Sequence, residues 1–275
     1  MAQEAPALLG GQGGFLILDP SVFLERFPWL AEVAPNMHAL QGLPRRRFEA
    51  DDDLLDRRET HPGAYLICSG FACRYNMFPN GQRQIIGLIL PGDLCDTRST
   101  MLDRVDYSVS AIDAVEALLI PTERLTDRVN RSTSVLRAIC RLTAIEDAMD
   151  RQWLLNIGHR TALERVAHLL CEIFTRLQLV GFTRQNTCDL PLSQTDIADA
   201  TALTPVHVNR MLMELRRRGI ISLHRRQLAI HDFDALQALG CFSSAYLLPH
   251  QAEGAPPRLL VSISKEAGNG ALLPS

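Results

Sequence analysis

Three polar residues, His207, Asn209 and Arg210, fall in the first turns of a helix that the sequence predicts after Thr204. An arginine can donate two hydrogen bonds to guanine O6 and N7, and an asparagine can bond adenine N6 and N7 in the same two-point way. The neighbouring Val206 offers an apolar side chain that can touch a thymine methyl group. These residue types at the start of a helix indicate recognition of base edges in a DNA major groove.

Two short helices around a tight turn are predicted to position these residues. Ser193 is a good N-cap for the first helix, and Asp196 three residues later completes an acidic form of the capping box. Thr204 is the N-cap of the second helix, and Pro205 takes its first position, where the missing N–H costs nothing. Gly219 ends that helix. Its apolar face has a spacing of three and four residues: Val208, Met211, Leu212 and Leu215.

A two-stranded hairpin with basic residues at its tip is predicted to follow. Residues 220–223 and 228–230 form its strands, and Arg225 at the tip can contact a phosphate. Residues 160–231 contain ten arginines and six acidic residues, a surplus of four positive charges, whereas the whole chain has a net charge of −3. A basic module on an acidic carrier is typical of a nucleic-acid-binding protein. The alternative is that the helices only form a compact fold and that the arginines are only solvent-exposed residues at the end of a helix.

Composition places the chain among ordinary globular proteins. Its 275 residues are enough for two modest domains, and 47% are hydrophobic and 21% charged. No apolar run approaches the roughly 18–20 residues of a membrane span, and the N-terminus lacks the basic start of a secretory signal. The seven cysteines are scattered and odd in number, which argues against a disulfide framework. We therefore expect a cytoplasmic protein with no membrane partner.

The N-terminal half is predicted to contain many short strands. Residues 1–19 include a glycine-rich segment at 10–14, but no Gly-Lys-Ser/Thr follows it, so we expect a flexible leader rather than a phosphate-binding loop. Two short helices are expected between Pro20 and Leu40. Strand patterns then run from Arg45 to Ile120 with turn signals at a spacing of about 8–12 residues, among them an Asn-Gly turn at residues 79–82. This pattern indicates a β-barrel or sandwich.

A long helix is predicted over residues 132–157. Its apolar stripe is typical of a short coiled coil or, equally, of a core face, and consists of Val135, Ala138, Leu142, Ile145, Met149 and Gln152. Residues 156–159, which include Gly158, are the expected hinge, and a further helix follows from Thr161 to about Leu179. Residues 240–275 are expected to be a weakly ordered tail.

Both halves resemble the Crp/Fnr family of bacterial transcription regulators, in a subgroup found in alphaproteobacteria. The similar motifs are Leu190-Pro-Leu-Ser-Gln-Thr-Asp-Ile-Ala-Asp-Ala, Leu203-Thr-Pro-Val-His-Val-Asn-Arg, Ala64-Tyr-Leu-Ile-Cys-Ser-Gly, Gly81-Gln-Arg-Gln-Ile, Leu90-Pro-Gly-Asp and Ser108-Val-Ser-Ala-Ile. The resemblance implies an α+β fold with a β-roll sensor of the cyclic-nucleotide-binding type at 20–131, a dimerisation helix at 132–157 and a winged helix-turn-helix at 158–239. The candidate DNA-contacting residues are Ser193, Gln194, Thr204, Val206, His207, Asn209, Arg210 and Arg225.

The same resemblance implies partners and a mechanism. A homodimer would bind palindromic double-stranded DNA and contact RNA polymerase, because two recognition helices about 34 Å apart read two half-sites. A signal in the β-roll would change the packing of the dimer helix and reorient the DNA-binding domains about Gly158. Arg210 matches a recognition-helix arginine of the family, but Pro205-Val206 stands where its best-known members have Arg-Glu. Their operator preference is therefore not carried over.

The sensor region departs from the cyclic-nucleotide binders of the family. Leu94-Cys-Asp-Thr-Arg-Ser-Thr replaces their Gly-Glu-x-Ala-Leu cassette, and Tyr107 stands where a small residue is usual. These departures argue against cyclic nucleotides. No cysteine precedes Cys68, which argues against the N-terminal iron–sulfur cluster of the oxygen sensors. We expect no cofactor, and the sequence does not identify effector-binding residues.

Two other interpretations of the sensor region stay open. Cys68, Cys73 and Cys95 are either buried small hydrophobes or a thiol sensor. A cupin-like metal enzyme is the competing class of function, but the region offers only His38 and His61 at no ligand-like spacing, and the chain has no catalytic motif. We therefore expect no metal and no enzyme activity. A third possibility is a regulator of the same fold that needs no effector.

Overall fold

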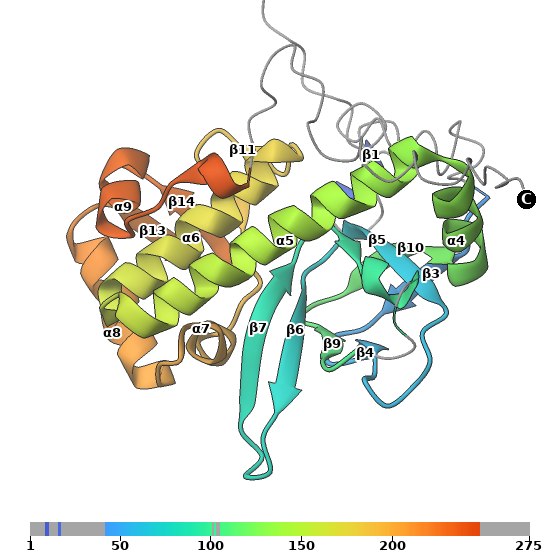
Figure 1. Ribbon diagram of the computed structural model, residues 1–275. Helices are drawn as coiled ribbons and strands as arrows, with labels where there is room; N and C mark the ends of the chain where they lie inside the picture. Colours follow the sequence, from blue (N-terminus) through green and yellow to red (C-terminus); the bar gives the residue numbers. More distant parts are fainter. Residues whose placement is uncertain (1–8, 11–15, 18–41, 101, 103–104, 248–275) are drawn as a thin grey trace, which may run out of the picture.

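The computed structural model describes residues 9–10, 16–17, 42–100, 102 and 105–247. A β-roll and a helical domain lie on either side of α5, the long helix that crosses Figure 1. The two helices expected before residue 42, and residues 248–275 of the expected tail, lie outside the described residues. Within the expected leader, the short strands β1 (Leu9–Gly10) and β2 (Leu16–Ile17) pair with each other.

Two four-stranded antiparallel sheets form the β-roll, as the turn spacing predicts. The first has the order β3 (Arg45–Phe48), β10 (Val115–Pro121), β5 (Gly63–Ser69) and β8 (Leu94–Cys95). The second has the order β4 (Asp53–Leu55), β9 (Ser108–Ala111), β6 (Ala72–Met77) and β7 (Arg83–Ile89). The predicted turn at 79–82 joins β6 to β7, with Gly81 at φ +81°, and the hairpin projects beside the helical domain in Figure 1. A 3-10 turn, η1 (Thr97–Thr100), follows β8.

Helix α4 (Thr122–Arg131) leads into α5 (Thr133–His159), and α6 (Ala162–Leu179) follows. Residues 156–159, the expected hinge, are helical, because α5 continues through Gly158 and ends at His159. The chain changes direction at Arg160, whose ψ is 147°, and the capping box of Thr161 and Glu164 starts α6 at once. A single glycine costs a helix only about 1 kcal/mol, which tertiary packing offsets.

The stripe predicted on α5 faces the chain's own core in part. Val135 is buried, and Leu142 and Met149 pack against the apolar clusters of the same chain. The solvent face of α5 instead carries Leu154 and Leu155, which are 71% and 54% exposed. The predicted stripe did not include these two leucines.

The helical domain is a winged helix-turn-helix. It consists of α6, α7 (Gln194–Thr201), α8 (Pro205–Arg217), α9 (Phe233–Leu239) and a four-stranded sheet. The strand order is β11 (Thr183–Arg184), β12 (Thr187–Asp189), β14 (Gln227–Ile230) and β13 (Ile221–His224). Residues 240–247, which the sequence assigned to a weakly ordered tail, are described and end in the turn η2 (Ser244–Tyr246).

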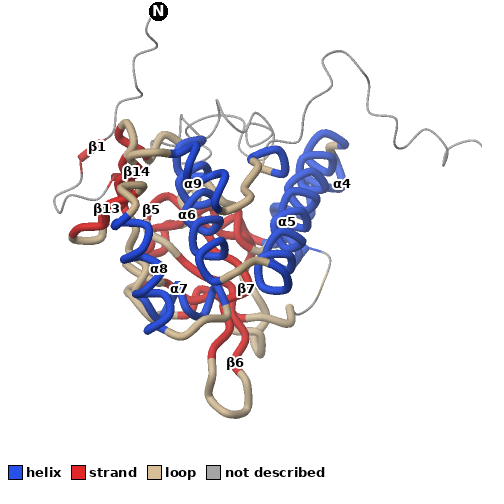
Figure 2. The backbone as a smooth tube through the Cα atoms, turned by 90° about the vertical axis from the view of Figure 1, so that its left-hand side faces the viewer, coloured by secondary structure: helices blue, strands red, loops and turns tan. Residues whose placement is uncertain are grey.

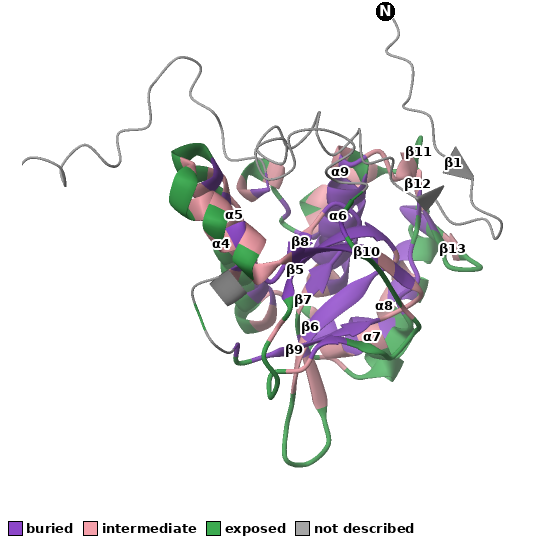
Figure 3. Ribbon diagram, turned by 90° about the vertical axis from the view of Figure 1, so that its right-hand side faces the viewer, coloured by how far each residue is buried: buried purple, intermediate pink, exposed green. Residues whose placement is uncertain are grey.

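One hydrophobic core runs from the β-roll into the helical domain. Cys73, Ile85 and Leu88 of the roll belong to the same buried cluster as Leu170 of α6 and Ile197 of α7. In Figure 3 the buried residues of the roll and of α6 lie together in the middle of the molecule. A large apolar interface argues against free motion of two domains, so reorienting them would expose packed side chains to water.

Candidate DNA-binding surface and sensor region

Helices α7 and α8 begin with the caps that the sequence predicts. The Ser193 hydroxyl accepts a hydrogen bond from the Asp196 backbone N–H at 3.1 Å, and the Asp196 carboxylate accepts one from the Ser193 N–H at 2.9 Å. Thr204 Oγ1 accepts from the His207 N–H at 3.3 Å. Between the helices, Ala202 takes a left-handed conformation with φ +52°, which makes the tight turn. Figure 2 shows the two helices side by side.

The outer face of α8 is free of protein cover in this structure. Val206, His207, Asn209 and Arg210 are all exposed, whereas Val208, Leu212 and Leu215 on the opposite face are buried. Gln194 of α7 donates a hydrogen bond through Nε2 to Asn209 Oδ1 at 3.3 Å. The structure therefore brings the two helices' candidate residues onto one polar surface.

Arg225 lies apart from α8, at the tip of the β13–β14 hairpin. His224 pairs with Gln227, so the tip is the two-residue turn of Arg225 and Arg226, at φ +48° and +65°. Two positive φ values match the type of turn that suits the twist of a hairpin, although glycine or asparagine is usual there. Both arginines line a cleft between the wing and the roll that also contains Asp113.

An ion-pair cluster that the sequence does not reveal joins the β6–β7 hairpin to α7. Arg83 donates through Nη2 to Asp196 Oδ1 at 2.6 Å and through Nε to Asp199 Oδ2 at 2.9 Å. Asp196 thus caps α7 and also holds the roll. The backbone carbonyl of Asp199 accepts a further bond from the Gln84 side chain. Because more than a hundred residues separate the partners, no local sequence signal could have found this contact.

A buried polar network connects α5, α6 and residues 240–247. The Glu172 carboxylate, 1% exposed, accepts hydrogen bonds from Trp153 Nε1 at 3.2 Å and from the Tyr246 hydroxyl at 2.8 Å. Arg176 contacts Glu172 Oε1 at 3.3 Å and also pairs with Asp93 of the roll. Burial, the nearby Glu172 carboxylate and this hydrogen bond all raise the pKa of Tyr246.

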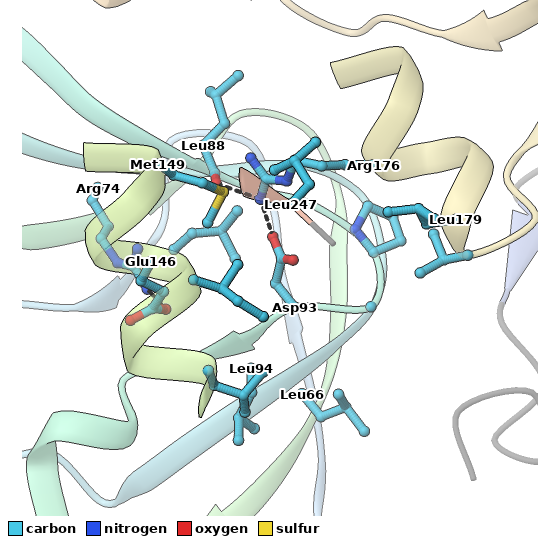
Figure 4. Close-up of a pocket in the computed structure, with 16 residues that line it drawn as sticks. Leu66, Arg74, Leu88, Asp93, Leu94, Glu146, Met149, Arg176, Leu179 and Leu247 are labelled. Carbon is cyan, nitrogen blue, oxygen red and sulfur yellow. Dashed lines mark hydrogen bonds and ion pairs between the residues drawn. The ribbon is translucent and has the colours of Figure 1, made fainter. Parts of the chain in front are cut away.

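A cavity of about 130 Å³ lies between the roll, α5 and α6. Figure 4 shows its apolar wall, which includes Leu66, Leu94 and Leu179, and the Arg176–Asp93 pair at one side. On another side Arg74 of β6 and Glu146 of α5 point toward one another, with Arg74 Nη2 2.6 Å from Glu146 Oε1. The cavity wall therefore combines apolar side chains with charged groups that are already paired with each other.

All seven cysteines lie in the described part of the chain, and each is free. The three thiol-sensor candidates are buried, and burial raises the pKa of Cys68 and of Cys73 to about 12 and that of Cys95 still higher. Since a thiolate is the reactive form, these three thiols are poorly suited to redox sensing. Cys140 and Cys241, which sequence reasoning passed over, are the exposed ones.

No group of three or more His, Cys, Asp or Glu side chains in the described part of the chain could hold a metal ion. Of the two sensor-region histidines, His38 lies outside the described residues. Among the described helices, none is both long enough and apolar enough to cross a membrane.

Two family descriptions match this chain. Residues 164–239 match the Crp-like helix-turn-helix domain, and residues 45–132 match the cyclic nucleotide-binding domain. The nitrogen fixation regulation protein FixK of Bradyrhizobium diazoefficiens is 28% identical over 207 residues, which are 75% of this chain and 86% of that protein. The transcriptional activator protein FnrL of Cereibacter sphaeroides is 29% identical over 174 residues, 62% of this chain and 69% of that protein.

Solved structures show the same architecture. The structure of FixK2 from Bradyrhizobium japonicum is 25% identical and covers 73% of this chain and 98% of that one, with a TM-score of 0.67. Its agreement spans both the roll and the helical domain. The arrangement of a β-roll, a long helix and a winged helix-turn-helix is thus shared with transcription regulators.

Proposed function

We propose that this chain, a member of the Crp/Fnr family of DNA-binding transcription regulators, binds a palindromic operator as a homodimer. The observation that carries the proposal is the polar outer face of α8, whose candidate residues are exposed while its apolar face is buried. A helix that is firmly packed on one side and free on the other can enter a major groove without unfolding. Regulators of this kind act on DNA in the cytoplasm.

Each candidate residue has a role in the proposal. Arg210 and Asn209 would contact base edges, Val206 a thymine methyl group, and His207 a base or a phosphate. The remaining candidates would contact phosphates at the ends of α7 and α8 and at the wing: Ser193, Gln194, Thr204 and Arg225. Phosphate contacts fix the position of the protein, and base contacts supply the sequence preference.

The proposed dimer forms through α5. Leu154 and Leu155 are adjacent exposed apolar residues on its solvent face, and a second copy of α5 would cover them. A two-fold axis along this helix would place two copies of α8 on one side of the dimer, where they could contact two half-sites. RNA polymerase is the expected further partner at the promoter.

The domain limits are part of this proposal, and the expected movement about Gly158 is revised. We propose a sensor roll over 20–131, a dimer helix over 132–157 and a DNA-binding domain over 158–239. The shared core and the Arg83 cluster favour a roll and a DNA-binding domain that move together rather than about Gly158. Any signal would then act on the packing of α5 between the two protomers.

The roll does not fit a cyclic nucleotide. A cyclic phosphate needs backbone N–H groups and a free guanidinium, whereas Arg74 is already paired with Glu146 and the buried carboxylate of Asp96 lies in the cassette segment. We therefore assign no step to a cyclic nucleotide. An enzyme is also disfavoured, because the relatives are transcription regulators.

Selection of bound sequences from random DNA duplexes tests the proposed function. The purified protein should enrich a two-fold symmetric site, and light scattering should find two chains on each selected duplex. A protein that enriches no sequence, or that binds the selected site as one chain, would contradict the proposal.

A further inference from the structure

Two arginine side chains of the roll lie close together in a largely buried region. Arg74 lies on β6 and Arg98 in η1, and their side chains are 10% and 25% exposed. The Arg74 guanidinium carbon lies 5.7 Å from the centre of the Tyr107 ring, a cation–π arrangement. Two cations held close together with little water are costly unless an anion lies between them.

Glu146 of α5 supplies that anion to both arginines. Its Oε1 accepts a hydrogen bond from Arg74 Nη2 at 2.6 Å, and its Oε2 lies 3.5 Å from Arg98 Nη2. The Glu146 side chain is 13% exposed, so water screens these pairs weakly. The neighbouring Asp147 also approaches Arg98, but at 3.7 Å and with 53% exposure, which makes it a weak partner.

We propose that Arg74 and Arg98 form an anion site in the roll, and that the Glu146 carboxylate is its permanent occupant, so that the regulator binds its operator without a diffusible effector. The site recognises a carboxylate, and the chain provides that carboxylate from its own dimer helix. This inference rests on the proposed function, because it concerns how operator binding is controlled.

The position of Glu146 explains how occupancy of the site reaches the dimer helix. Ile145 and Met149, on the same part of α5, line the cavity beside the roll. Trp153, one turn further along, donates to Glu172 of α6. The same stretch of α5 therefore contacts the roll through Glu146 and α6 through Trp153. Pairing of Glu146 with the roll fixes the position of this stretch, and through α6 the position of the DNA-binding domain.

Removal of the carboxylate and its replacement from solution test the proposal. Glu146→Ala keeps Cβ but removes the rest of the side chain, which leaves two guanidinium groups without their anion and a space of about the size of acetate. We expect this variant to bind the selected operator about tenfold or more weakly, and sodium acetate at tens of millimolar to restore much of that affinity relative to equal sodium chloride. Wild type should respond to neither acetate nor cyclic AMP nor cyclic GMP.

Two further variants separate the site from general effects. Glu146→Gln keeps the side-chain volume but not the charge, and should also weaken operator binding without gaining from acetate, because the amide fills the space. Asp127→Asn breaks an exposed ion pair with Arg131 on α4 and should change neither property.

Thermal unfolding gives a reading that does not depend on DNA. Acetate should raise the unfolding temperature of Glu146→Ala but not of wild type. If Glu146→Ala binds the operator as wild type does, or gains neither affinity nor stability from acetate, or if a cyclic nucleotide strengthens operator binding by wild type, the proposal is overturned. If wild type selects no operator, the proposed function fails, while the thermal measurement still decides whether the anion site exists.

Discussion

At the scale of single residues, the helix-turn-helix combines local and distant roles in the same side chains. Asp196 caps α7 through the Ser193 N–H and also pairs with Arg83 of the roll. For Arg210, by contrast, the described contacts reveal no role in stabilising the fold. Its side chain is exposed on the outer face of α8. An exposed arginine at this position is available for DNA.

Arg210→Ala should weaken binding to the selected operator by about 1–3 kcal/mol and relax the preference at one base pair, because a two-point contact with a guanine is lost. Fluorescence anisotropy with operator variants at each position measures both effects. Arg131→Ala, on exposed α4, removes the same charge away from the DNA-binding surface and is the matched control. An equal loss on random DNA would show that Arg210 is only a phosphate contact.

The thiols should divide into two classes on alkylation. At neutral pH iodoacetamide should modify Cys241 first, because Cys241 is exposed and lies outside α5, whereas the proposed dimer contact would shield Cys140. Cys68 and Cys73 should stay unmodified while the protein is folded, since burial keeps the pKa of each at about 12 and suppresses the thiolate. Mass spectrometry of proteolytic peptides reads the order. Fast modification of Cys68 or Cys73 would return them to the list of sensor candidates.

At the scale of elements, the contacts between the roll and the DNA-binding domain matter most. The β6–β7 hairpin lies beside α7, and Arg83 bonds two carboxylates of that helix. Residues 240–247 close the other side of the domain, where Phe242 and Leu247 are buried. Both contacts join elements that are far apart in the sequence.

Arg83→Ala should lower the free energy of unfolding by about 2 kcal/mol, because Asp196 and Asp199 then lose a partly buried cation. Hydrogen exchange should become faster in β7 and α7. The exposed pair of Arg131 and Asp127 is the control, and Arg131→Ala should cost about 0.5 kcal/mol or less. Equal effects of the two variants would mean that the hairpin contact contributes little.

Truncation distinguishes residues 240–247 from the rest of the tail. A chain that ends at residue 247 keeps every contact described for this segment. A chain that ends at residue 239 loses Phe242, Leu247 and the Tyr246 bond to Glu172, and each buried side chain of this size contributes about 1.5–3 kcal/mol. Calorimetry of the two truncated proteins compares them directly, and similar unfolding temperatures would contradict the packing described above.

At the scale of the whole molecule, the roll and the DNA-binding domain share one core, and the exposed apolar residues of α5 lie outside it. In the dimer proposed above, recognition of two half-sites would depend on the oligomeric state, because each chain carries one copy of α8.

Leu154→Glu should convert the dimer to a monomer, because it places a charge in the apolar contact between two copies of α5. Light scattering after size exclusion measures the mass, and operator binding should fall together with it. Phe78→Glu is the matched control, since Phe78 is 53% exposed at the turn of the β6–β7 hairpin, which projects away from α5 in Figure 1. A Leu154→Glu variant that remains dimeric would exclude this face as the interface.

The sequence by itself determined the features that depend on neighbouring residues. The caps at Ser193 and Thr204 and the turn at Gly81 involve groups within a few residues of one another, so their geometry follows from local chemistry. The apolar spacing along α8 likewise predicted which side would be buried. The α+β class and the family motifs follow from the same short-range patterns.

Only the tertiary structure decided which distant residues meet. Glu146 lies 72 residues from Arg74, and a helix pattern does not reveal that its carboxylate enters the roll rather than the solvent. The sequence also ended the long helix at residue 157, whereas α5 continues through Gly158 to His159, because the weak helix propensity of a single glycine does not by itself end a helix. Long-range contacts depend on how elements pack, and packing energy depends on all the elements at once.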